Sequence, residues 1–169
     1  KLYHISTTSV SGMGLSENNL EQSENVTYFS EMDLYKNQNL NNTYIRTKFE
    51  AEKLILENIN NGLDACIFRM GNISNRFSDA KFQINVSENA FVNRIKSILK
   101  LQVIQEGFKA HATEFAPVDL CADAIIKVIK SNPKFTVFHI FNNNLISFVD
   151  VVKYLNELDI KLDFVSDFC

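Results

Sequence analysis

The sequence is poor in the residue patterns that build metal centres, membrane spans and nucleic-acid surfaces. Its 169 residues include three cysteines, three histidines and five glycines, and the formal net charge is −3. No apolar run is long enough to span a bilayer, so we expect no membrane-embedded segment. No basic tract stands out, and the charge gives no general attraction to nucleic acid or to an anionic membrane. At 46% hydrophobic and 22% charged residues, the composition is that of an ordinary globular domain.

The cysteines Cys66, Cys121 and Cys169 lie far apart and lack the paired spacing of metal ligands. Cys66 and Cys121 stand inside apolar segments, which predicts buried free thiols and fits a reducing, cytoplasmic location. The three histidines are equally scattered, so we expect no metal site.

The apolar pattern predicts an α/β fold that begins with a βαβ unit. Residues 2–10 (LYHISTTSV) indicate a buried strand that runs into hydroxyl side chains, followed by a turn at residues 11–14. Residues 63–70 (LDACIFRM) lack alternation, as is typical of a parallel strand buried on both faces. Between them, capping residues at 41–43 and a stop at 60–62 predict a helix over residues 44–60. Strand, helix and strand in this order make a parallel crossover.

The remaining chain alternates loops, helices and short strands. Residues 15–43 are polar and without sustained periodicity, and we interpret them as a long surface excursion with a short turn near residues 29–32. Beyond residue 72 we expect Ser87 to cap one helix and Asp119 another. The predicted helices span residues 87–101, 120–130 and 147–158, and the extended segments lie at residues 103–104, 113–118, 136–141 and 161–165.

Tyr44 and Lys48 are four residues apart on the predicted crossover helix, so they share one face. That face continues through Ala51 and Ile55, which predicts that the pair lies on the buried stripe, where an ammonium needs a partner or a function. A nearby ammonium favours ionisation of a phenol, which could then donate a proton to a carbonyl under reduction. The spacing alone is a weak signal.

Two strand ends flank this helix. The hydroxyls of residues 6–9 either cap the loop after the first strand or face a ligand at the carboxyl edge of the sheet, where open α/β sheets bind their ligands. Gly71 either serves a tight turn or permits close approach of a ligand to the backbone.

Taken together, these motifs resemble the extended short-chain dehydrogenase/reductase superfamily. Within it they are most similar to the thioester reductase domains that end nonribosomal peptide synthetases and carboxylic acid reductases. The matching segments are residues 5–12 (ISTTSVSG), 29–34 (FSEMDL), 44–53 (YIRTKFEAEK), 68–72 (FRMGN), 82–85 (FQIN), 115–119 (FAPVD) with 122–124 (ADA), and 138–142 (FHIFN).

The resemblance implies NADPH-dependent reduction of an acyl or peptidyl thioester held on a phosphopantetheinylated carrier protein, which releases an aldehyde or an alcohol. It implies a catalytic set of Thr7, Tyr44 and Lys48, with Tyr44 as proton donor. The implied cofactor-binding residues are Ser6, Thr7, Tyr44, Lys48, Met70, Gly71 and Asn72, and the implied substrate-binding residues are Thr8, Ser9 and Asn85.

The resemblance also implies a Rossmann-like domain of which this sequence is the C-terminal part. Residues 1–72 would be a partial Rossmann βαβ unit, and residues 73–169 mainly a smaller substrate-binding subdomain. No Gly-x-Gly-x-x-Gly or Gly-x-x-Gly-x-x-Gly follows a strand here, and that loop would seat the cofactor pyrophosphate. We therefore expect an N-terminal phosphate-binding half to be missing and this chain alone to be inactive. We also expect it to associate, through the exposed edge of strand 2–10, with itself or with the missing half.

Two other interpretations remain open. One is a nucleotide-sugar epimerase or dehydratase of the same superfamily, which would share the Tyr44/Lys48 pair and hold NAD tightly. The other is a non-catalytic module that docks a carrier protein, in which the pair is vestigial. A glycine-rich loop upstream in the parent sequence would favour an enzyme.

Overall fold

The computed structural model describes residues 1–12, 28–84 and 86–166 of the chain. These residues form two compact units: the first comprises residues 1–71 and 121–140, and the second residues 72–120 and 141–169. We expected the second part to begin after residue 72 and to run mainly to the end of the chain. The structure instead returns residues 121–140 to the first unit, because a strand in this stretch pairs with the sheet there.

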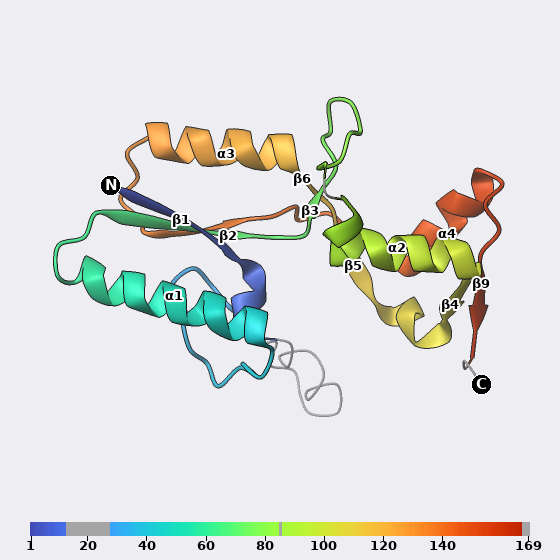
Figure 1. Ribbon diagram of the computed structural model, residues 1–169, viewed down its shortest axis with the longest axis horizontal. Helices are drawn as coiled ribbons and strands as arrows, with labels where there is room; N and C mark the ends of the chain where they lie inside the picture. Colours follow the sequence, from blue (N-terminus) through green and yellow to red (C-terminus); the bar gives the residue numbers. More distant parts are fainter. Residues whose placement is uncertain (13–27, 85, 167–169) are drawn as a thin grey trace. The chain divides into compact units, whose positions relative to one another are not determined.

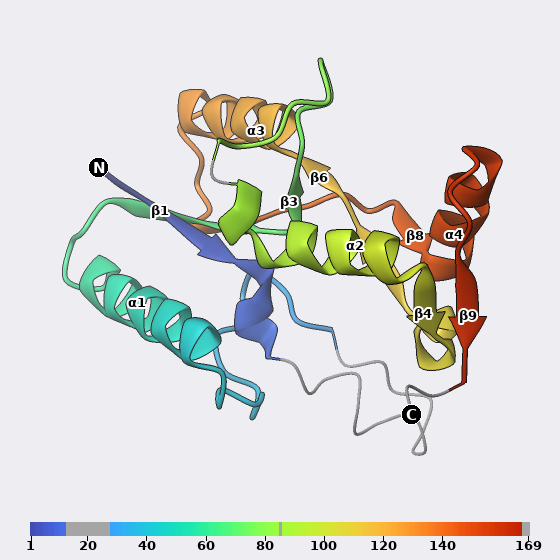
Figure 2. The ribbon, with the colours of Figure 1, turned by 45° about the vertical axis from the view of Figure 1, so that its right-hand side comes forward.

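The first unit is built on a parallel sheet. Its strands are β1 (Leu2–Thr7), β2 (Ala65–Met70) and β7 (Val137–Ile140), in the order β1-β2-β7. Helix α1 (Thr43–Ile59) and helix α3 (Val118–Lys130) lie on opposite faces of the sheet (Figures 1 and 2). The crossover β1-α1-β2 confirms the predicted βαβ unit and the α/β fold.

Strand β2 is the centre of this unit, and all six of its residues are buried. On one of its faces Ala65 and Ile67 pack with Val137 of β7 and Ile55 of α1. Burial on both faces explains why the sequence of β2 shows no alternation. Cys66, in β2, is a buried free thiol and Cys121, in α3, is buried, as expected, whereas Cys169 lies outside the described residues.

Strand β1 is shorter and more exposed than the sequence predicts. It ends at Thr7 and continues as a 3₁₀ helix, Thr8–Ser11, where we expected strand to Val10. Leu2 and Ile5 remain 41% and 48% exposed. Among the described residues β1 pairs with β2 alone, so its other edge has no strand beside it.

The second unit packs helices against short strand pairs. Its elements are α2 (Ala90–Leu101), α4 (Phe148–Glu157) and the strands β3 (Ile73–Ser74), β4 (Val103–Gln105), β5 (Ala112–Glu114), β6 (Ala116–Pro117), β8 (Leu145–Ser147) and β9 (Asp163–Val165); 3₁₀ helices span Val86–Glu88 and Glu106–Ala110. The pairs are β3-β6, β4-β9 and, antiparallel, β5-β8. A core of Ile104, Phe148, Val152 and Leu162 holds α4 beside the β4-β9 pair.

Helix starts in this unit follow their capping side chains. Asn89, and not Ser87, caps α2, because its side chain accepts from Val92 N. Asp119 lies in the first turn of α3 and not before it, and its carboxylate accepts from Phe77 N at 2.9 Å and Ser78 N at 3.1 Å. Within the described residues, no helix is both long and apolar enough to cross a membrane.

Candidate functional site

The carboxyl end of β1 forms a turn rich in hydroxyl groups. Thr7 is 8% exposed, and its Oγ1 accepts a hydrogen bond from Ser9 N at 3.2 Å, which caps the 3₁₀ helix. Thr8 Oγ1 donates to Met70 O, at the end of β2, at 3.3 Å. The structure therefore brings Thr7, Thr8 and Met70 to one edge of the sheet. Since Thr7 Oγ1 acts as the acceptor, its own hydrogen stays available for another partner.

The neighbouring hydroxyls differ in environment. Ser6 is 3% exposed, and its Oγ has no hydrogen-bond partner among the described residues. Ser9 is exposed on the 3₁₀ helix. Asn85, the remaining predicted substrate contact, lies outside the described residues.

Lys48 reaches the strand that carries Thr7. Its Nζ donates to Ile5 O at 3.0 Å, two residues before Thr7. Tyr44 lies one turn earlier on α1 and is 56% exposed, and its hydroxyl makes no hydrogen bond to the part of the chain that the structure describes. The ammonium of Lys48 and the hydroxyl of Tyr44 both keep donors for a further partner.

The expectation that Tyr44 and Lys48 lie on the buried stripe of α1 was wrong. The buried residues of the helix are Ile45, Phe49, Glu52 and Ile55. Tyr44 precedes this stripe by one position, which is about 100° of rotation around the helix, and so it faces solvent. Lys48 is half-buried beside the stripe.

Met70, Gly71 and Asn72 leave the sheet at the end of β2. Gly71 N donates to Ile140 O at 2.9 Å, within the first unit. Asn72 N donates to Glu114 Oε1 at 2.9 Å, within the second unit, and Glu114 is 9% exposed. The sequence did not single out Glu114, because its partners are main-chain amides distant in the chain.

The sequence also missed a buried ion pair between Arg69 of β2 and Glu52 of α1. Both side chains are fully buried, and the arginine also donates to Ser30 O at 3.1 Å and to Asp33 O at 2.8 Å. An arginine in an otherwise apolar strand is the sequence signal that a buried carboxylate lies opposite it. The pair fixes the segment that follows residue 28 against the sheet, so the end of the predicted surface excursion is anchored.

His139 of β7 and Glu31 complete this cluster. Arg69 only donates, so His139 Nε2, at 3.3 Å from Nη1, is the acceptor and the ring is neutral. Burial lowers the pKa of His139 and the charge of Arg69 lowers it further, although Glu31 acts in the opposite direction. Burial would raise the pKa of Glu31, but hydrogen bonds from main-chain amides and the charge of Arg69 hold it below its usual value.

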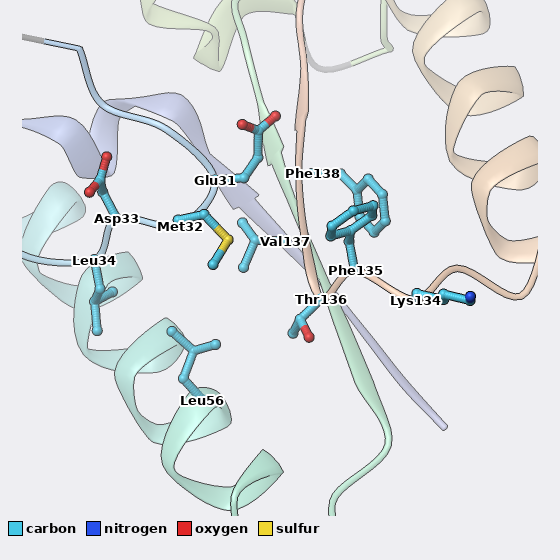
Figure 3. A pocket seen from close by; sticks show the side chains of 10 residues that line it. All are labelled: Glu31, Met32, Asp33, Leu34, Leu56, Lys134, Phe135, Thr136, Val137 and Phe138. Atoms are coloured by element: carbon cyan, nitrogen blue, oxygen red, sulfur yellow. The ribbon is translucent and has the colours of Figure 1, made fainter.

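A pocket of about 610 Å³ opens beside this cluster, on the first unit (Figure 3). Its lining residues come from the 31–34 segment, α1, the approach to β7 and the start of β7: Glu31, Met32, Asp33, Leu34, Leu56, Lys134, Phe135, Thr136, Val137 and Phe138. None of the predicted site residues lines it. Among the described residues, no group of three or more metal-ligating side chains could hold a metal ion.

A family described as male sterility protein, with an NAD-binding domain, matches residues 1–125 of this sequence. The chain belongs to this family. It is a member of the extended short-chain dehydrogenase/reductase superfamily, and reductase domains of nonribosomal peptide synthetases are similar to it. No curated protein sequence matches it.

Two solved structures support this assignment. A thiolation-reductase di-domain from an archaeal nonribosomal peptide synthetase is 36% identical, with a TM-score of 0.81, over 97% of this chain and 34% of that chain. The aureusimine biosynthetic cluster reductase domain is 28% identical, with a TM-score of 0.82, over 98% of this chain and 42% of that chain. The chain thus spans between a third and a half of the length of these structures.

The alternative interpretation as a nucleotide-sugar epimerase or dehydratase is supported by similarity of fold alone. dTDP-glucose 4,6-dehydratase from Bacillus anthracis str. Ames, a complex with NAD, is 18% identical, with a TM-score of 0.63, over 100% of this chain and 50% of that chain. At this identity the likeness reports the Rossmann-like fold, and function has to be argued from the site.

Proposed function

We propose that this chain is part of an NADPH-dependent reductase that releases a carrier-bound acyl or peptidyl thioester as an aldehyde or an alcohol. The observation that carries the proposal is the bond from Lys48 Nζ to Ile5 O, which ties the lysine of the Tyr-x-x-x-Lys pair to the strand that ends in Thr7. The family assignment and the likeness to a thiolation-reductase di-domain support a thioester on a carrier protein as substrate.

The available donors fit the nicotinamide-ribose end of the cofactor. Lys48 uses one of its three N–H groups on Ile5 O, and the hydrogens of the Thr7 and Tyr44 hydroxyls are unused within the described chain. Lys48 would hold the ribose hydroxyls, and the backbone of Met70, Gly71 and Asn72 would lie beside the ring. When bound, the nicotinamide supplies a hydride to the substrate carbonyl.

The side chains would stabilise the charge that develops on the carbonyl oxygen. Thr7 Oγ1 would donate one hydrogen bond, since Ser9 N already occupies it as an acceptor. Tyr44 would donate a second hydrogen bond and then its proton. Such preorganised donors are typically worth about 3 kcal/mol each in the transition state. Thr8 and Ser9 would contact the substrate beyond the carbonyl.

The test compares two tyrosines with equal exposure. Tyr44 and Tyr154 are each 56% exposed, and Tyr154 lies on α4 of the second unit. In the complete reductase domain, Tyr44→Phe should lower kcat for NADPH consumption on an acyl-pantetheine thioester by about 100-fold or more. Tyr154→Phe should leave it unchanged. Near-normal turnover of Tyr44→Phe would refute the assigned role, and a wild type without thioester-dependent turnover would favour a non-catalytic docking module.

A further inference from the structure

Gln38 is a buried polar residue in the segment that leads to α1. It is 5% exposed and uses both amide hydrogens: Nε2 donates to Val10 O at 3.0 Å and to Leu34 O at 2.8 Å. Its Oε1 accepts from Lys36 N at 2.6 Å. The side chain therefore links the 34–38 segment to the 3₁₀ helix that follows β1, and a residue with this many satisfied contacts has a fixed orientation.

The 3₁₀ helix depends on outside contacts. Thr8–Ser11 is a single short turn, and 3₁₀ hydrogen bonds have poorer geometry than those of an α-helix. Val10 in this turn is fully buried, and its carbonyl oxygen is the one that Gln38 binds. The same turn presents Ser9 N to Thr7 Oγ1. The side-chain amide of Gln38 thus holds the turn in place. The position of the turn then determines which lone pair of Thr7 Oγ1 accepts the hydrogen bond from Ser9 N.

The two segments also meet without spare space. A Cβ on Gly12, directly after the turn, would stand 2.6 Å from the Cβ of Gln38. A side chain at residue 12 would clash with Gln38, and a movement of the turn away from Gln38 would lengthen the bond to Val10 O. Both contacts therefore limit how far the turn can move relative to Gln38.

We propose that Gln38 is a positioning residue for Thr7: through Val10 and Ser9 it holds the Thr7 hydroxyl with its hydrogen directed to the substrate carbonyl. This inference rests on the proposed function, because it acts only if Thr7 donates to that oxygen. It gives the 34–38 segment a role other than contact with the substrate.

A double-mutant cycle in the complete reductase domain tests the inference. Gln38→Met keeps the side-chain length and removes the hydrogen bonds, and Thr7→Val removes the hydroxyl. With NADPH and an octanoyl-pantetheine thioester, Gln38→Met should lower kcat about tenfold, as expected for a misplaced catalytic group, and change the KM for NADPH less than about twofold. In the Thr7→Val background Gln38→Met should cause no further loss of kcat, because the group that it positions is gone.

The matched control is Gln105→Met, since Gln105 precedes a 3₁₀ helix of the second unit without a side-chain capping bond. It should keep the wild-type kcat. Gln38→Glu is the second variant, because a carboxylate keeps the shape of the amide but cannot donate to Val10 O. It should repeat the pattern of Gln38→Met, so the test stands if the methionine variant does not fold.

The outcomes separate the two proposals. An equal loss of kcat from the Gln38 variants with and without the Thr7 hydroxyl would show a merely structural role and overturn the inference. Unchanged kcat in both Gln38 variants would overturn it as well. If Thr7→Val itself retains the wild-type kcat, the catalytic assignment in the proposed function fails first.

Discussion

Arg69 Nη2 lies 2.8 Å from Glu52 Oε2, and neither side chain is exposed to solvent. The guanidinium Nε also donates to Glu52, and its Nη1 and Nη2 donate to the main chain of the 30–33 segment and to His139. A buried charge is tolerated only when its partners satisfy it, so this pair joins β2, α1, β7 and the incoming segment into one network. The network holds residues 30–33 against the sheet of the first unit.

Removing one member of this pair should be severely destabilising. Glu52→Gln leaves the buried guanidinium without a counter-charge, and we expect a loss of about 3–5 kcal/mol in the free energy of unfolding, measured by urea denaturation. Glu50→Gln is the control, because Glu50 is exposed on the same helix. It should change stability by less than about 0.5 kcal/mol. Equal effects of the two substitutions would contradict the assigned burial.

Stability should also depend on pH through His139. Burial, with the charge of Arg69, lowers the pKa of His139, whereas the carboxylates Glu31, Glu52 and Asp33 raise it. The unfolded chain, with an ordinary histidine pKa of about 6.5, binds this proton more readily than the folded chain. The free energy of unfolding should therefore be highest above about pH 6.5 and fall as the pH drops below it.

His139→Gln removes this titration and keeps an acceptor for Arg69. The fall in stability between pH 7 and pH 5, from denaturation curves, should become shallower without vanishing, because burial lowers the pKa of His4 as well. Identical slopes for His139→Gln and the wild type would show that His139 is not the responsible group.

Much of the first unit could be predicted from local pattern. The run at 65–70, apolar except for Arg69, indicates a strand buried on both faces, and Asn42 with Asn60–Gly62 bounds α1 closely. The Tyr44/Lys48 spacing is also local, since one helix carries both residues. Where two capping residues compete, as Ser87 and Asn89 do before α2, the sequence alone does not decide which side chain will bond.

The supporting residues could not be predicted, because their partners are remote in the chain. Arg69 meets Glu52 17 residues away and Ser30 39 residues away, and Gln38 meets Val10 across 28 residues. Such pairings depend on the tertiary fold and leave no periodic signal. The exposure of Tyr44 was missed for another reason: a rotation of one position on α1 moves a side chain from the buried stripe to its border.

The free edge of β1 should make the 169-residue chain self-associate. Leu2, Tyr3 and Ile5 are 41%, 37% and 48% exposed on a strand that, within the described residues, pairs on one side only. Exposed edges and apolar patches of this kind favour strand pairing between copies. Size-exclusion chromatography with light scattering should show a mass that rises with concentration.

A charge on this edge should weaken the association. Ile5→Lys places an ammonium on the strand, which is a common protection of natural edges, and should shift the chain toward monomer. Leu54→Lys is the control, since Leu54 is 61% exposed on α1. It should leave the concentration dependence unchanged. A wild-type chain that stays monomeric at high concentration would contradict the prediction.

Substitutions at Gly12 and Gly62 can distinguish two effects of an added side chain, namely backbone strain and steric crowding. Gly12 and Gly62 have φ of 83° and 97°, which a side chain rarely adopts, so alanine at either position is strained. An added Cβ meets nothing within 4 Å at Gly62, but it stands 2.6 Å from the Gln38 Cβ at Gly12.

Gly62→Ala should cost about 1–2 kcal/mol of unfolding free energy from strain alone. Gly12→Ala should cost more, because main-chain atoms of Asn39 at 3.1 Å limit the relief that a shift of Gln38 could give. In the complete reductase domain Gly12→Ala should also lower kcat while Gly62→Ala preserves it. Equal losses of stability in the two variants would show that the turn after β1 can move away from Gln38.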